Sequence, residues 1–429
     1  MAAPGESYYM AITPNSKPYI SHGLPFDKAC EHHAENTFHA SRVYVIVSRS
    51  ISKTAAFTAL QKALGNRIVG IRYGVAPHTP WEDVFALVED LKGKSPDLIV
   101  TLGGGSITDG IKLARLLAAN DVSDMQGLDE LFARCKPDLT NLAAGPAADV
   151  KPAAIPVINV PTTLSAGEFT PGGGATDLKT YEKKILLHES MAADLVVFDP
   201  VLTISTPARF WLSTGVRAID HCVEGLYANL PNASSELSSD LVKDLRELLV
   251  GLLKTKSKWN DIDARLQCQL ALPASIKAIH NGSDISFAQE STCPSMGASH
   301  GIGHQLGPMG VGHGETSCIM MPFVMKYNWV HGDERVRTSL RQAASAFWDE
   351  PAVVEALALK EADRHSTDPG DLVAKFISTL GLPRSLSKFQ IGSDKFGSLA
   401  DNSLTDPCTI VNPVKLDKEK VIEILQMAA

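Results

Sequence analysis

The first half of the chain alternates between short apolar runs and longer segments with helical periodicity. The apolar runs, which we expect to be strands, are Arg42–Ser48, Arg67–Tyr73, Asp97–Leu102, Pro156–Val160 and Asp194–Asp199. The helical segments between them are Lys53–Leu64, Trp81–Leu91 and Ile107–Ala119. Strands that are apolar on both faces and alternate with helices are typical of a parallel sheet covered on both sides. We therefore predict an α/β N-terminal domain.

From about Thr206 onward the strand pattern stops and helical periodicity remains. The predicted helices are Pro207–Ala228, Glu236–Lys254, Ile262–His280, Glu315–Tyr327, Glu334–Phe347, Asp371–Leu380 and Leu416–Met427. A chain of 429 residues is also long for a single core. We predict an α/β domain over residues 1–204 and an all-helical C-terminal domain over 205–429, with a ligand cleft between them.

Composition and charge exclude several classes of function. The net charge of −8 provides no basic surface for nucleic acid or an anionic membrane. The N-terminus lacks the pattern of a secretory signal, and no apolar run reaches the roughly 18 residues of a membrane span. Seven cysteines without a C-x-x-C pair are typical of reduced thiols. We expect a cytoplasmic protein that acts on a small molecule.

A glycine cluster follows one predicted strand and precedes a predicted helix, in Thr101–Lys112 (TLGGGSITDGIK). The cluster consists of Gly103, Gly104, Gly105 and Ser106. Glycines here let backbone N–H groups approach a phosphate, and the helix N-terminus adds a positive dipole. A plain tight turn is the alternative. Asp109 and Lys112 follow in the first helical turns, either beside the ligand or as a solvated capping pair.

A second loop, Pro161–Pro171 (PTTLSAGEFTP), also follows a predicted strand. Because ligands of parallel sheets bind outside the carboxyl ends of the strands, its hydroxyl groups can line a polar pocket at the same edge. Between the two loops, the Pro-rich stretch 137–156 is expected to be a surface loop.

Three histidines lie close together in the second half, in Gly297–Asn328. His300 and His304 are four residues apart and therefore share one face of a helix. His313 lies in a glycine-rich bend that can fold back toward that face. Imidazole is a common metal ligand and moves protons near neutral pH, so this stretch is a candidate active site.

A fourth histidine lies on the predicted helix that contains STGVRAIDHCVEGLY, residues 213–227. Arg217 and His221 are four residues apart on one face, so His221 can join the other histidines. Two simpler interpretations stay open: His221 as a hydrogen-bonded core residue, and Arg217 with Asp220 as an intrahelical ion pair.

Together these motifs resemble the iron-containing (group III) alcohol dehydrogenase superfamily, which has a dehydroquinate synthase-like fold. The motifs are GGGSITDGIK at 103–112, PTTLSAGEFTP at 161–171, STGVRAIDHCVEGLYA at 213–228 and SHGIGHQLGPMGVGHG at 299–314. TTLSAGEFTP and HCVEGLYA look most like the maleylacetate reductase branch. The resemblance implies an NAD(P)-dependent oxidoreductase with a nucleotide-binding N-terminal domain, and a homodimer is common in the family.

The resemblance also implies roles for individual residues. Gly103 to Ser106 would hold the cofactor pyrophosphate. Further cofactor contacts would come from Asp109, Lys112, Thr162, Thr163 and Ser165. In metal-dependent members an Asp and three histidines bind the metal, and those histidines match His221, His300 and His313. His304 matches a histidine assigned to substrate contact or proton relay.

Two positions depart from the family pattern. Arg217 stands where the metal-binding Asp is expected, and a cation there should repel a divalent ion such as iron or zinc. We expect its guanidinium to replace the metal and bind a substrate oxygen. Asp220 should point off that face and is therefore a poor substitute for the missing metal ligand. Arg49 stands where many members place an acid that binds the ribose, which favours NADPH over NADH.

The sequence thus predicts an NAD(P)H-dependent reductase that delivers hydride to an activated C=C or C=O bond. Its catalytic residues would be Arg217, His221, His300, His304 and His313. One alternative is a metal-dependent alcohol dehydrogenase, because three protein ligands and water suffice for catalytic zinc. The others are a non-redox cyclase, isomerase or lyase that uses the same cleft, and a protein without catalytic activity.

Overall fold

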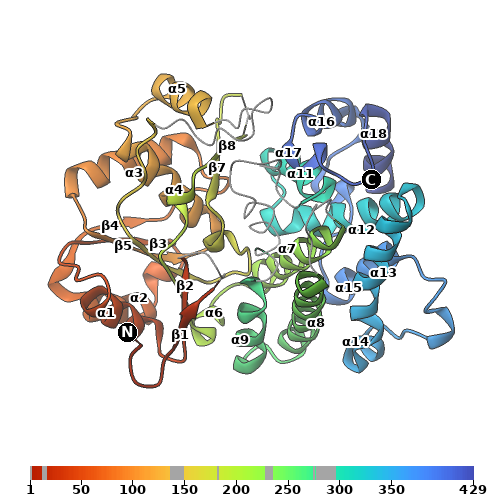
Figure 1. The fold of residues 1–429 in the computed structure, drawn as a ribbon, viewed down its shortest axis with the longest axis horizontal. Coiled ribbons are helices and arrows are strands. Elements are labelled where there is room, and N and C mark those ends of the chain that lie inside the picture. Colours follow the sequence, from red (N-terminus) through yellow and green to blue (C-terminus); the bar gives the residue numbers. More distant parts are fainter. Residues whose placement is uncertain are drawn as a thin grey trace. The chain divides into compact units, whose positions relative to one another are not determined.

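The computed structural model describes residues 2–11, 17–135, 149–180, 183–227, 235–273, 276 and 296–429. The described chain forms two compact units, one from residues up to Thr206 and the other from residues beginning at Pro207. This division lies next to the boundary predicted between residues 204 and 205. The first unit contains the sheet and the second is helical, which confirms the predicted fold class (Figure 1).

Seven strands form the main sheet of the first unit, in the order β1-β2-β9-β6-β5-β3-β4. They are β1 Ser7–Met10, β2 Tyr19–His22, β3 Val43–Val47, β4 Ile68–Tyr73, β5 Leu98–Gly103, β6 Val157–Pro161 and β9 Leu195–Phe198. Only β1 and β2 pair antiparallel; the other neighbouring pairs are parallel. The five predicted strands are thus confirmed. The β1–β2 hairpin was missed because its strands, SYYM and YISH, mix polar and aromatic residues and form no continuous apolar run.

Helices cover both faces of this sheet, as predicted. They are α1 Phe26–Asn36, α2 Ala55–Leu64, α3 Trp81–Lys94, α4 Gly105–Ala119, α5 Met125–Cys135 and α6 Pro200–Thr203. Successive strand residues point to opposite faces. Accordingly, Val45 of β3 belongs to the core beside α1 and α2, whereas Ile46 belongs to the core beside α3 and α4. A second, two-stranded sheet pairs β7, Gly172–Thr176, with β8, Lys183–Leu187.

The carboxyl ends of β3, β5 and β6 meet at one edge of the sheet. Gly103 at the end of β5 pairs with Pro161 at the end of β6. The N–H of Thr162 donates to the carbonyl of Gly103 at 3.0 Å. The glycine cluster and the hydroxyl-rich loop therefore start side by side. Of the predicted loop 137–156, residues 149–156 form neither helix nor strand, and the rest lies outside the described residues.

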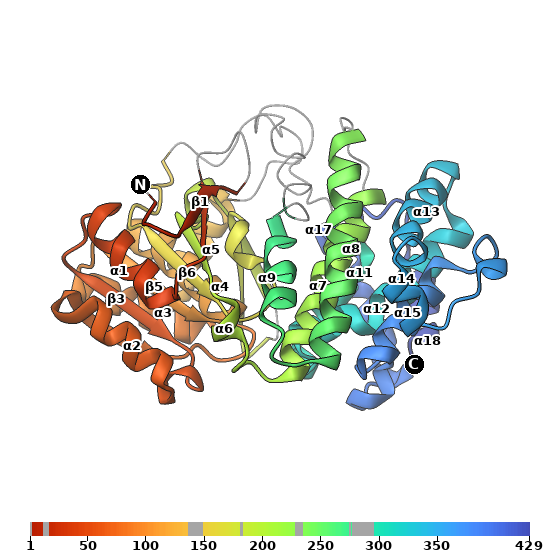
Figure 2. The same cartoon turned by 90° about the horizontal axis from the view of Figure 1, so that it is seen from below.

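The described helices of the second unit are mostly those predicted. They are α7 Ala208–Tyr227, α8 Ser235–Ser257, α9 Ile262–Leu270, α11 Ala298–Leu306, α12 His313–His331, α13 Glu334–Trp348, α14 Pro351–Ala356, α15 Pro369–Leu380, α16 Phe396–Ser403, α17 Pro407–Ile410 and α18 Lys418–Met427. Figure 2 shows α7 lying along α8, and α7 also packs against α12 and α13. Helix α11 packs against α12, α16 and α17. None of the described helices is long and apolar enough to cross a membrane.

Candidate active site

One face of α7 carries a row of buried polar residues. These are Arg217, Asp220, His221 and Glu224. Residues three, four and seven positions apart lie on the same face of a helix. The expectation that Asp220 points off this face is therefore wrong: its Oδ2 accepts a hydrogen bond from Ser299 Oγ at 2.7 Å and lies 3.3 Å from His300 Nδ1.

The carboxylate of Glu224 holds the N-terminal end of α11. It accepts hydrogen bonds from the backbone N–H groups of Gly297, at 2.6 Å, and Ser299, at 2.9 Å. These are among the donors that a helix start leaves without an intrahelical partner. The same carboxylate lies 2.6 Å from His300 Nδ1. Sequence reasoning missed Glu224, although its position seven residues after Arg217 was a usable signal.

His221 and His300 stack on each other, with ring centroids 4.8 Å apart. Burial, followed by the charges of neighbouring groups that include Arg217, holds the pKa of both rings well below the usual value. Among the described residues, His221 Nδ1 and His300 Nε2 are buried and have no hydrogen-bond partner. Two neutral imidazoles therefore offer ring nitrogens to a ligand.

The guanidinium of Arg217 lies within this histidine group. Its Nη1 donates to Thr316 Oγ1 at 3.1 Å and to Ser317 Oγ at 3.2 Å. Its Nη2 lies 3.5 Å from His304 Nε2. Burial lowers the pKa of Arg217, while the negative charges of Asp220 and Glu224 act against this shift. Arg217 is thus more than the intrahelical ion pair considered from the sequence.

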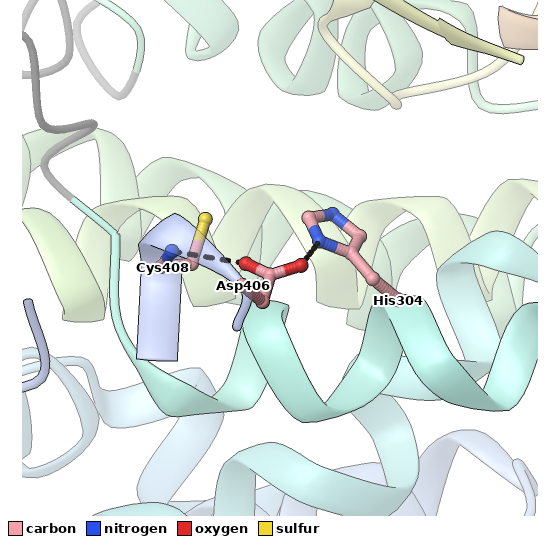
Figure 3. A group of neighbouring side chains, drawn as sticks. All are labelled: His304, Asp406 and Cys408. Atoms are coloured by element: carbon pink, nitrogen blue, oxygen red, sulfur yellow. Dashed lines mark hydrogen bonds and ion pairs between the residues drawn. The ribbon is translucent and has the colours of Figure 1, made fainter. Parts of the chain in front are cut away.

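His304 forms a pair with an acid from the C-terminal part of the chain (Figure 3). Its Nδ1 lies 2.8 Å from Oδ2 of Asp406, whose Oδ1 accepts from the N–H of Cys408 at 2.9 Å. Burial works against ionisation of Asp406, but the charge of His304 and the hydrogen bonds lower its pKa overall. Asp406 was missed because it lies 102 residues from His304 in the sequence.

Two groups of side chains bring potential metal ligands together among the described residues. One comprises Asp220, Glu224 and His300, and the other His304, Asp406 and Cys408; in each, the ligand atoms lie within 4.8 Å of one another. His313 belongs to neither group. It is the first residue of α12 and is exposed. Of the predicted set of His221, His300 and His313, the first two stack on each other.

The first unit carries the other predicted residues. Helix α4 begins at Gly105, directly after β5, and no side chain caps its N-terminus. A side chain at Gly104 would place its Cβ 3.3 Å from Thr163 Cγ2, and one at Gly105 would place it 3.7 Å from Ser165. The bare backbone at the start of α4 thus faces the hydroxyl-rich loop, with Thr163 Oγ1 lying 3.1 Å from Ser165 Oγ.

Lys112 is buried beneath this loop and is not a solvated capping residue. Its Nζ donates to Thr170 Oγ1 at 3.0 Å, to the carbonyl of Gly172 at 2.9 Å and to the carbonyl of Gly167. Burial lowers its pKa to about 8, against the charges of Asp109 and Glu168. Glu168, also fully buried, was not predicted; burial raises its pKa to about 7.

Arg49 lies two residues beyond the end of β3 and is exposed. Its Nε donates to the carbonyl of Tyr73 at 3.2 Å. Its aliphatic stem runs over Gly74, where an added Cβ would lie 2.9 Å from Arg49 Cγ. The end of β4 therefore orients this guanidinium at the carboxyl edge of the sheet.

Comparisons with known proteins agree with this arrangement. Residues 25–200 match the family model described as iron-containing alcohol dehydrogenase, and residues 211–429 match the C-terminal model of the same family. The chain is 49% identical to "Dehydrogenase FUM7" of Gibberella moniliformis, over 100% of both chains.

Solved structures share the fold. A 1,3-propanediol oxidoreductase aligns with a TM-score of 0.76 at 20% identity, covering 95% of this chain and 97% of that one. Maleylacetate reductase from Agrobacterium tumefaciens aligns with a TM-score of 0.69 at 20% identity, covering 95% of each chain. On its family matches, the chain belongs to the iron-containing alcohol dehydrogenase family and is an oxidoreductase.

Proposed function

We propose that this protein is an NAD(P)H-dependent reductase that acts, without a metal, on an activated C=C or C=O bond of a small substrate. The observation that supports this most is the buried guanidinium of Arg217 beside His304 Nε2. In this proposal the guanidinium provides the positive charge that a metal ion provides in metal-dependent members.

The residues present do not fit an iron ion bound by the family's usual ligands. The usual Asp is Arg217, whose buried cation would lie next to the ion and repel it. Among the described residues, neither His221 nor His313 belongs to a group of potential ligands. Asp220 and Glu224 face Nδ1 of His300, which already makes a hydrogen bond, whereas the unpaired atom of that ring is Nε2.

The residues of the first unit fit a dinucleotide. The uncapped N-terminus of α4 and the absence of side chains at Gly104 and Gly105 suit a pyrophosphate. Thr163 and Ser165 supply hydroxyl groups beside it. A bound reduced nicotinamide supplies the hydride. We assign Arg49 to the 2′-phosphate of NADPH, because a cation there favours phosphate over free hydroxyls.

Arg217 and the three histidines near it then have separate roles in the reaction. Arg217 donates hydrogen bonds to the substrate oxygen on which negative charge develops, a role that is strongest in a site shielded from water. The unpaired ring nitrogens of His221 and His300 bind the same substrate. His304 supplies the proton that completes the reduction.

The decisive experiment compares Arg217→Ala with wild type in NADPH oxidation across a panel of enoyl and carbonyl substrates. We expect kcat/KM to fall by about 10²-fold or more, because one preorganised oxyanion donor is worth that much. Arg341→Ala, which removes an exposed guanidinium on α13, is the control. Full activity of Arg217→Ala would remove the main support of the proposal, as would loss of wild-type activity on treatment with a chelator.

A metal-dependent alcohol dehydrogenase is the second candidate, favoured by the two groups of potential ligands. The chelator experiment separates it from the metal-free reductase. The non-redox and inactive alternatives have lost their support, because the chain belongs to a family of dehydrogenases. From the family resemblance we also propose a homodimer, which light scattering coupled to gel filtration would test. From the cysteine pattern we propose a cytoplasmic location.

A further inference from the structure

Two of the contacts of the Asp406 carboxylate have different consequences (Figure 3). Oδ1 accepts from the backbone N–H of Cys408, at the start of α17. Oδ2 meets Nδ1 of His304 at 2.8 Å. The side chains of both residues are largely buried, with exposed fractions of 7% for Asp406 and 11% for His304. The first contact caps a short helix, and the second can control an imidazole ring.

We propose that Asp406 is the positioning residue of His304: it keeps a proton on Nδ1 and thereby directs Nε2 to the reaction site beside Arg217. This inference rests on the proposed function, in which His304 donates the proton. A carboxylate accepts hydrogen bonds and cannot donate when ionised, so the ring nitrogen that faces it must carry hydrogen. The other nitrogen, Nε2, then lies 3.5 Å from Arg217 Nη2.

Before the reduction, His304 is an imidazolium that carries a proton on each ring nitrogen. A bound reduced nicotinamide would supply hydride to one end of the C=C or C=O bond. The Nε2–H bond breaks, and its proton adds to the other end. Neutral His304 with hydrogen on Nδ1 remains, still bonded to Asp406. A carboxylate behind the ring favours the imidazolium and fixes its orientation, as in other acid–histidine pairs.

Helix capping alone does not explain why Asp406 also contacts His304. The sequence contains other Asp-Pro pairs that begin helices, and Asp368 is the nearest match in the second unit. Its Oδ1 accepts from the N–H of Gly370 at 2.7 Å, in the same relation as Asp406 to Cys408. Asp368, however, caps α15 and has no histidine among its hydrogen-bond partners in the described chain. It is therefore a matched control for the capping role.

The test compares Asp406→Asn, Asp406→Ala and Asp368→Asn. Asparagine keeps the acceptor for Cys408 N–H, but its NH2 group can face Nδ1 and force the ring proton to Nε2. We expect Asp406→Asn to lower kcat by about 10²-fold or more, with KM little changed and an unfolding midpoint close to that of Asp368→Asn. Asp406→Ala should lose less kcat than Asp406→Asn, because it removes the acid without imposing the wrong tautomer.

A purely structural role predicts the opposite order. Asparagine is as good a helix cap as aspartate, so Asp406→Asn would then resemble wild type and Asp406→Ala would be the damaged variant. That order of kcat values would overturn the proposal. Asp368→Asn should keep wild-type kcat.

A readout that does not depend on turnover separates this inference from the proposed function. In protein labelled with ¹⁵N-histidine, we expect the neutral His304 ring to carry its proton on Nδ1 in wild type and on Nε2 in Asp406→Asn. The same tautomer in both proteins would overturn the proposal even if the enzyme is a reductase. Lack of turnover with every substrate would instead count against the proposed function alone. One zinc per chain that both Asp406→Asn and Cys408→Ser remove would make Asp406 a metal ligand and also overturn the inference.

Discussion

Glu224 Oε2 lies 2.6 Å from Nδ1 of His300, although the two residues are 76 positions apart. The same side chain binds the N–H groups of Gly297 and Ser299, so one carboxylate both starts helix α11 and orients the ring that this helix carries. Burial raises the pKa of Glu224 to about 7, although these hydrogen bonds lower it. The stability of α11 and the geometry of the candidate site therefore depend on one residue.

Replacing Glu224 by alanine should destabilise the second unit strongly. The change leaves two buried backbone donors unpaired and removes the shorter of the two carboxylate contacts of His300 Nδ1. We expect it to cost about 3 kcal/mol in the free energy of unfolding. Glu224→Gln keeps an acceptor and should cost about 1 kcal/mol. Urea unfolding measures both, with exposed Glu355→Ala as a control expected to stay within about 0.5 kcal/mol of wild type. Equal losses for Ala and Gln would contradict the capping role.

The sequence predicted the parts of the site that depend on local spacing. His300 and His304 share a face of α11 because they are four residues apart on one helix. Arg217 and His221 share a face of α7 for the same reason. The predicted strand–turn–helix around the glycine cluster is β5 followed by α4. Because regular helices and strands repeat the same residue spacings, the sequence pattern is enough to predict which of these residues share a face.

Contacts between distant segments could not be predicted in this way. Helix α17 reaches α11 because Gly301 has no side chain: an added Cβ would lie 2.1 Å from Thr409 Oγ1. That close approach brings Asp406 to His304, and neither residue signals it locally. His313 shows a different limit: it begins α12 and is exposed, and its glycine-rich surroundings leave its position open to the sequence pattern. Permissive backbone allows a contact without specifying it.

Arg217→Asp should give the second unit a metal site. The change removes the buried cation and places a carboxylate on the face of α7 that carries His221, next to a ring nitrogen of His300 that has no partner in the described chain. Carboxylate and imidazole are ligands that suit iron and zinc. We expect purified Arg217→Asp, but not wild type, to retain close to one metal ion per chain in elemental analysis. Arg217→Asn, which removes the charge without adding an anion, is the matched control and should retain much less.

The buried acid of the first unit should give stability a measurable pH dependence. Burial raises the pKa of Glu168 from its ordinary value of 4.5 to about 7, against the charge of Lys112. Between these two values the folded state holds a proton that the unfolded state has released, so the free energy of unfolding falls as the pH rises. Wild type should therefore lose stability relative to Glu168→Gln from about pH 4.5 to about pH 7. Urea midpoints across this range measure the difference, and a constant difference would contradict it. Exposed Glu189→Gln should track wild type.

Arg49 should decide the choice between NADPH and NADH. Its guanidinium is oriented by the carbonyl of Tyr73 and by the passage of its stem over Gly74, so its outer nitrogens can meet a 2′-phosphate without large reorganisation. Hydrogen bonds to a charged group contribute about 1.5–3 kcal/mol, so Arg49→Ala should raise the Kd for NADPH by about 10- to 100-fold. The Kd for NADH, which lacks that phosphate, should change by less than about threefold.

Fluorescence titrations with both cofactors measure these constants. Arg67→Ala removes a half-buried guanidinium that pairs with the exposed Glu35 and should leave both Kd values unchanged. Gly74→Ala perturbs the orientation while the charge remains, because the added Cβ would displace the Arg49 stem and would also strain the backbone, whose φ is +85° at this position. We expect this variant to weaken NADPH binding more than NADH binding. If wild type instead binds NADH more tightly, or if Arg49→Ala weakens both cofactors equally, Arg49 does not contact the 2′-phosphate. The selectivity would then have to come from the glycine turn and the hydroxyl-rich loop.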